Sequence, residues 1–107
     1  MLDIRRIRAE PNTVKEALAK RDASHATAVD RILELDATRR ETIGTVNDLK
    51  AERNVASKRV GELKRAGEDA DELIAETRAL GERIASLDET VKAADEEIRD
   101  TLLALPN

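Results

Sequence analysis

Apolar and small residues recur along most of this chain in alternating gaps of three and four. The pattern appears twice, once on either side of Gly67, and its mean spacing of about 3.5 residues keeps one seam facing a partner helix over many turns. A repeat sustained this long is typical of a coiled coil. The seam positions of the first stretch are Ile32, Leu35, Arg39, Thr42, Val46, Leu49, Arg53, Ala56, Val60 and Leu63. Those of the second are Leu73, Thr77, Leu80, Ile84, Leu87, Val91, Ala94, Ile98, Thr101 and Leu105.

The segment between the two stretches carries turn residues. Gly67 suits the left-handed residue that ends a helix, and either Asp69 or Asp71 suits the cap that begins the next one. The sequence therefore predicts an all-α fold, a long antiparallel two-helix coiled-coil hairpin with short N-terminal helices packed at its base. Its predicted parts are a helical base over residues 1–26, a first arm helix over 27–66, a tip at 67–70 and a second arm helix over 71–105.

Charged residues beside the seam suggest how the two helices are aligned. Opposite charges at flanking heptad positions would face each other if the chain folds back near residue 67 or 68. The pairs concerned are Glu52 with Arg83, Arg59 with Glu76 and, about one or two residues out of step, Lys50 with Asp88.

The first 26 residues read as two short helices that cover the open base of the hairpin. Asp3 is the expected cap of the first, and Pro11 suits the first residue of the second. A connector over residues 22–26 should follow. Thr27 with Asp30 then forms a weak capping box that opens the long helix. The residues expected to pack at the same end are Leu102, Leu103 and Leu105.

Composition limits what such a chain can do. Its 107 residues suffice for one domain, and without Phe, Trp, Tyr or Cys it lacks the material for a deep core, a disulfide framework or a thiolate metal site. No apolar run approaches a transmembrane span, and the first residues lack the core of a signal peptide, so a cytoplasmic location is expected. With one histidine, His25, expected at the surface, and no glycine-rich phosphate loop, no catalytic residue, cofactor site or metal site is predicted.

Charge is distributed unevenly about the predicted tip. The net charge is −4, yet residues 50–65 hold six cations against two acids, and residues 68–76 hold five acids and no cation. Polar residues join the cations in an outward stripe of the first helix, which is either plain solvated surface or a contact for a polyanion. Without aromatic side chains to stack on bases, such a contact would be to phosphates and to RNA shape.

Two further features leave alternatives open. Arg39 and Arg53 occupy seam positions, where they either fix the register by pairing with acids such as Glu97 or serve binding. Three glycines lie in mid-helix, each at a cost of about 1 kcal/mol relative to alanine, and they are either tolerated or allow another backbone to approach. These are Gly44, Gly61 and Gly81.

At these residues the chain resembles the N-terminal domain of bacterial-type seryl-tRNA synthetases. Residues 52–61 match that family's E-R-N-x-x-S-K-x-[IV]-G signature, and residues 35–40 match its L-D-x-x-R-R segment. Residues 67–69 match the G-E-D at the arm tip, and Leu80 with Gly81 matches the L-G of the returning helix. Residues 105–107 are similar to the leucine-proline-asparagine exit toward the catalytic domain, so the resemblance covers essentially the whole chain.

The resemblance implies a tRNA-binding arm that grips the long variable arm and elbow of serine tRNA through phosphate and shape contacts. It implies a homodimeric parent enzyme and no contact with DNA or membrane. It also implies a class II catalytic domain, using ATP and magnesium, expected after Asn107; this chain would be the non-catalytic part of that ligase. The expected RNA-binding residues are Lys50, Arg53, Asn54, Ser57, Lys58, Arg59, Gly61, Lys64 and Arg65. The alternative is a structural or adaptor coiled coil that binds other helices, which leaves the order of polar residues in the signature unexplained.

Overall fold

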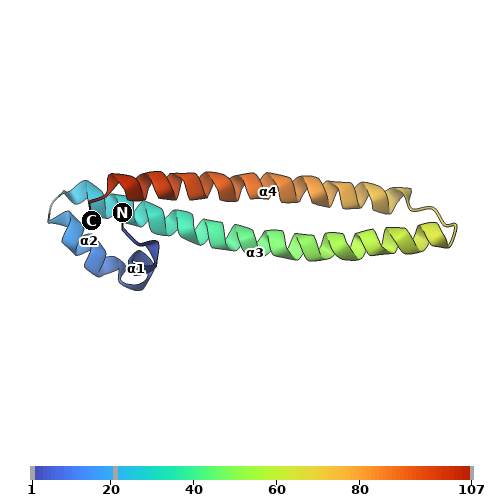
Figure 1. Cartoon of the computed structure of the whole chain (residues 1–107), viewed down its shortest axis with the longest axis horizontal. Helices are drawn as coiled ribbons and strands as arrows, with labels where there is room; N and C mark the ends of the chain where they lie inside the picture. The colour runs from blue at the N-terminus through green and yellow to red at the C-terminus, as the bar shows by residue number, and fades with distance from the viewer. Residues whose placement is uncertain (1, 21, 107) are drawn as a thin grey trace. The chain divides into compact units, whose positions relative to one another are not determined.

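A computed structural model describes residues 2–20 and 22–106 of the chain. Its elements are α1 (Ile4–Ala9), α2 (Pro11–Ala19), α3 (Ala23–Arg65) and α4 (Asp71–Ala104) (Figure 1). The described residues contain no strand, so the predicted all-α hairpin is confirmed. The chain divides into a base unit, Met1–Arg40 with Lys92–Asn107, and an arm unit, Glu41–Val91. Both long helices contribute to both units.

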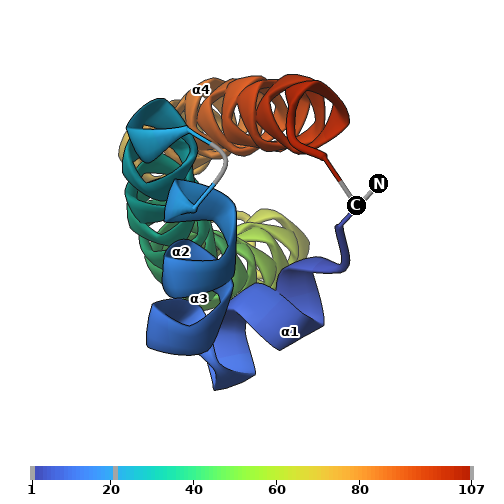
Figure 2. The same cartoon turned by 90° about the vertical axis from the view of Figure 1, so that its left-hand side faces the viewer.

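In the base unit, α1 and α2 pack beside the start of α3 and the end of α4 (Figure 2). The largest fully buried side chains are Ile7, Val29 and Ile32. Of the leucines predicted to pack here, Leu102 and Leu105 are buried, whereas Leu103 is 64% exposed. One stripe of a helix can face a core, and Leu103 follows Leu102 by a rotation of about 100°. The buried core of the base unit is Ile7, Val14, Leu18, Val29, Ile32, Leu35, Ile98, Leu102 and Leu105.

Local sequence sets the ends of the short helices as predicted. The Asp3 carboxylate accepts a hydrogen bond from the Arg5 backbone N–H at 2.9 Å and caps α1. Pro11 is the first residue of α2, where its missing N–H would have no helical partner in any case.

The start of α3 differs from the prediction. The helix begins at Ala23, so the connector over residues 22–26 and the capping box at Thr27 are wrong. The cap is Asp22, whose Oδ1 accepts from the Ser24 backbone N–H at 2.9 Å. Aspartate is a stronger cap than threonine, and its bond lowers the pKa of the Asp22 carboxyl. His25 therefore lies within the helix, half-buried and not at the open surface, and its Nδ1 has no hydrogen-bond partner among the described residues.

In the arm unit, α3 and α4 run antiparallel and side by side (Figure 1). Val46, Leu49 and Ile84 form its buried cluster, with Leu80 and Leu87 packed against them. All the seam positions named from the 3-4 spacing, in both units, are buried or partly buried. The predicted seam is therefore confirmed.

The tip is closed by backbone hydrogen bonds at the end of α3. Gly67 has φ +74°, and its N–H donates to the Lys64 carbonyl at 3.1 Å, while the Glu68 N–H donates to the Leu63 carbonyl at 2.9 Å. This pair of bonds is the Schellman motif, which favours glycine because the left-handed conformation strains a side chain. Of the two candidate caps for α4, Asp69 serves: its carboxylate accepts from the Asp71 N–H at 2.9 Å. The long helices end one residue earlier than predicted, at Arg65 and Ala104.

Candidate nucleic-acid interface

Most of the predicted RNA-binding residues share one side of α3 in the arm unit. Helical geometry places eight of the nine there, because their spacings of three, four and seven residues return to the same side. Arg53 and Gly61 are half-buried near the seam, and the other six are exposed. We call this set the basic stripe: Lys50, Arg53, Asn54, Ser57, Lys58, Gly61, Lys64 and Arg65.

A groove runs between this side of α3 and the neighbouring face of α4. It is lined by Ser57 and Val60 from α3 and by Ile74, Thr77 and Arg78 from α4. Arg78 thus extends the positive charge of the basic stripe across to the second helix. The charge distribution along the sequence did not point to Arg78, because this residue follows an acidic segment. The register that faces Arg59 with Glu76 also places Arg78 opposite Ser57, so the sequence did hold the signal.

Arg59 lies apart from the basic stripe. It lines a second groove on the other flank of the seam, with Glu52, Glu76 and Arg83 around it. Two of the three pairs predicted from the register, Glu52 with Arg83 and Arg59 with Glu76, therefore share one groove, whereas Lys50 and Asp88 do not line it. None of the three joins as an ion pair in the described residues, and Arg59 donates to Glu62 on its own helix at 3.4 Å. We call this the apolar groove, and its remaining lining residues are Val55, Ala56, Leu73, Ala79 and Leu80.

Part of the charge asymmetry at the tip has a structural cause. Lys64 and Arg65 occupy the last turn of α3, and Asp71 with Glu72 occupies the first turn of α4. Cations at a helix C-terminus and acids at an N-terminus are both favoured by the helix dipole. That effect fades within one turn, so it does not account for Lys58 or the more distant Lys50.

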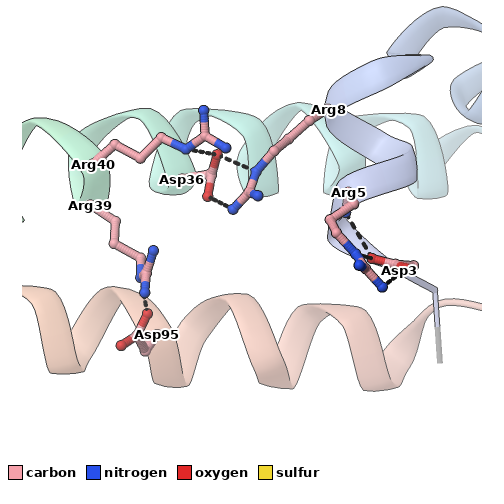
Figure 3. Close-up of polar contacts among 7 residues, drawn as sticks. All are labelled: Asp3, Arg5, Arg8, Asp36, Arg39, Arg40 and Asp95. Carbon is pink, nitrogen blue, oxygen red and sulfur yellow. Dashed lines mark hydrogen bonds and ion pairs between the residues drawn. The ribbon is translucent and has the colours of Figure 1, made fainter.

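The base unit holds a polar cluster that sequence reasoning missed. Asp36 is 5% exposed, and its carboxylate accepts from Arg8 Nε at 2.8 Å and Arg8 Nη2 at 2.6 Å (Figure 3). Arg40 approaches the same carboxylate at 3.2 Å. The hydrogen bonds from Arg8 lower the pKa of Asp36 against the opposing effect of burial, and the same pairing raises the pKa of Arg8. This cluster ties α1 to α3 and is satisfied within the chain.

The seam arginines differ in their partners. Arg39 pairs with Asp95 across the helices of the base unit (Figure 3). The acid suggested from the sequence, Glu97, is instead engaged by Arg31 at 3.1 Å. Arg53 has no ion-pair partner among the described residues and stays half-buried beside the basic stripe. The register-fixing interpretation therefore applies to Arg39.

The three mid-helix glycines are not required by packing. A Cβ added at Gly44, Gly61 or Gly81 would meet no heavy atom within 4 Å. Each glycine therefore lowers the stability of its helix, and none of them is needed to avoid a steric clash inside the chain.

The described residues show no alternative site chemistry. They contain no group of three or more His, Cys, Asp or Glu placed to hold a metal ion. No helix in the described part of the chain is long and apolar enough to cross a membrane. The surface features of the arm unit considered below are thus the basic stripe with its adjoining groove and the apolar groove on the other flank of the seam.

Together these features define the class: a helical-hairpin arm domain with a cationic flank and a small helical base. The chain belongs to the seryl-tRNA synthetase N-terminal domain family, whose model matches residues 1–107. It is similar to a chain in the crystal structure of seryl-tRNA synthetase from Pyrococcus horikoshii complexed with ATP, with 38% identity and a TM-score of 0.93. The match covers 100% of this chain and 24% of that one, so this chain spans about a quarter of that relative. A comparison with curated protein sequences gave no match.

Proposed function

We propose that this chain is the tRNA-binding arm of a serine–tRNA ligase and that the basic stripe is its RNA-facing side. The observation that carries the proposal is the gathering of exposed cations on one flank of α3, with Arg78 of α4 across the adjoining groove. The family to which the chain belongs supports RNA as the polyanion. Phosphates fit this surface because the contacts on offer are cations and small polar groups.

The mode of recognition follows from the missing aromatics. With no Phe, Trp or Tyr, the arm offers no platform on which to stack unpaired bases. Contacts from Lys58, Lys64 and Arg65 would follow the backbone of a double-stranded element, as suits the long variable arm and elbow of serine tRNA. Specificity then depends on RNA shape, because phosphate contacts carry little sequence information.

The rest of the proposed enzyme lies outside this chain. ATP, named with the Pyrococcus horikoshii relative, and magnesium belong in our proposal to a class II catalytic part, in a homodimeric cytoplasmic enzyme. Our proposal places no catalytic step on this chain.

The test is a triple variant, Lys58→Glu, Lys64→Glu and Arg65→Glu, titrated with serine tRNA at several salt concentrations. All three side chains are exposed, so the fold should be kept, with a loss of about 1–2 kcal/mol because Lys64 and Arg65 no longer complement the helix dipole. Binding should weaken strongly, and the slope of log affinity against log salt should flatten by about one to three, roughly one per lost phosphate contact.

A matched control carries the same change of net charge elsewhere. Lys20, Lys92 and Arg99 are exposed cations outside the basic stripe. Their triple replacement by glutamate should leave the salt slope unchanged. A tRNA with a short variable arm should bind weakly to all proteins. The proposal fails if the stripe variant and the control lose affinity equally, because a general charge effect would then explain the binding.

A further inference from the structure

The floor of the apolar groove is formed by the seam residues Ala56, Leu73 and Leu80. Val55 lines its outer edge on α3 and is 71% exposed. Among the described residues, the exposed large hydrophobic side chains are Val55 and Leu103. An apolar area as small as this does not mark an interaction site by itself, so the charges around the groove carry the argument.

Four charges border this floor, and they are largely unused within the chain. No ion pair involves Glu52, Glu76 or Arg83 among the described residues, and Arg59 makes a long contact to Glu62, at 3.4 Å, with 60% of its side chain exposed. Each helix contributes one acid and one base to the groove. These groups are therefore available to a partner.

The arrangement of these charges is self-complementary. Along α3 toward the tip the acid Glu52 comes before the base Arg59, and along the antiparallel α4 the base Arg83 is farther from the tip than the acid Glu76. A second copy facing this groove can be related by a twofold axis across the helices or along them. In the first case each helix meets its own counterpart, and in the second α3 meets α4. Every acid then faces a base in both arrangements.

We propose that the apolar groove is a self-association surface on which a second copy of this chain docks face to face. Isologous contacts require such a self-complementary patch. The axis we propose runs across the helices, so that α3 meets α3 of the second copy and the two Val55 side chains lie against each other. The charges would then form a rim that fixes orientation. Most of the basic stripe lies on the other flank of the seam and stays open, and only Lys58, three residues after Val55, lies next to the contact.

The contact is expected to be weak. The groove spans about two turns of α3 and three of α4, which is well below the area of a standard stable interface. Association should therefore appear only at high protein concentration, and salt should weaken it because the rim charges are exposed.

The first experiment is sedimentation equilibrium of the full chain from about 10 µM to about 1 mM, a range suited to weak contacts. The wild type should show a monomer–dimer equilibrium. Val55→Glu should weaken the dimer by at least about tenfold, since it places two like charges against each other at the centre. The matched control, Leu103→Glu, changes the other exposed apolar residue and should associate like the wild type.

Charge reversal gives a second, independent measurement. One variant combines Glu52→Arg with Glu76→Arg, and another combines Arg59→Glu with Arg83→Glu. Each should be monomeric alone, because its groove carries a single sign of charge. An equimolar mixture should form a heterodimer, which rescues association without restoring either groove.

Three outcomes would overturn the proposal. The wild type could stay monomeric throughout the range, or Val55→Glu could dimerise as strongly as Leu103→Glu. The two charge-reversed variants could also fail to associate with each other while each remains helical by circular dichroism. Any of these would mean that a second copy does not occupy the groove.

Discussion

The buried carboxylate of Asp36 offers the most direct test of how the base unit is held together. Replacing it in Asp36→Asn keeps the size of the side chain and removes the charge that Arg8 and Arg40 contact. Asp36 is on α3 and Arg8 is on α1, so the change weakens the attachment of α1 to the long helix.

The magnitude follows from burial. Removing one partner of a fully buried ion pair costs about 3–5 kcal/mol. Here the Asp36 side chain is 6% exposed, but those of Arg8 and Arg40 are 29% and 58% exposed, so water screens part of the interaction. We expect a loss of about 2–3 kcal/mol in the free energy of unfolding, against about 1 kcal/mol or less for an exposed pair. For a chain of this size that corresponds to a fall in Tm of about 8–12 °C.

The assay is urea unfolding followed by circular dichroism, with Asp95→Asn as the matched control. Asp95 also pairs with an arginine, but its side chain is 48% exposed and that of Arg39 is 32% exposed. Asp36→Asn should therefore destabilise the chain clearly more than Asp95→Asn. Equal losses in the two variants would refute the argument that burial makes the Asp36 cluster important.

Comparing the wild type with Asp36→Asn over a range of pH tests the pKa of Asp36. Its folded pKa is lowered, chiefly by the hydrogen bonds from Arg8, so the carboxylate stabilises the fold fully above the unfolded pKa of about 3.9. This contribution is lost as pH falls through the lower folded pKa. The stability difference between wild type and Asp36→Asn should be constant from about pH 5 to 7 and should shrink below about pH 4. A difference that shrinks already near neutral pH would contradict the assignment.

Further predictions concern the seam and the glycines. Leu49→Asp, at a side chain that is 7% exposed, should cost about 3–4 kcal/mol in urea unfolding, whereas Asn47→Asp on the exposed face should change stability by about 0.5 kcal/mol or less. Similar free energies of unfolding for the two variants would contradict the assignment of Leu49 to the buried seam. Gly44→Ala should raise the free energy of unfolding by about 1 kcal/mol, because the added Cβ meets open space in a helix. Gly67→Ala should lower it by about 1–2 kcal/mol, because φ is +74° at the tip, and a reversed order would contradict the Schellman assignment.

Local and periodic information was enough to predict the hairpin. The 3-4 spacing predicts which side chains meet, since a helix repeats its faces at a fixed interval whatever surrounds it. Asp3, Pro11 and Gly67 act on their own neighbours, so their roles could also be read directly from the chain. The start of α3 was missed because two acceptable caps, Asp22 and Thr27, lie close together and the stronger one is used.

Only the tertiary structure decided the ion pairs and shared surfaces formed by residues that are distant in the chain. Asp36 reads as an ordinary polar residue until α1 brings Arg8 against it, and Arg39 takes Asp95 while Arg31 takes Glu97. The packing of α3 against α4 also decides which cations share a surface. Arg78 of α4 lies across the groove beside the basic stripe, whereas Arg59 of α3 lines the other groove. A helix spreads neighbouring residues around its axis, so charges adjacent in sequence lie on different flanks, and only the packing of a second helix determines which distant residues share a surface.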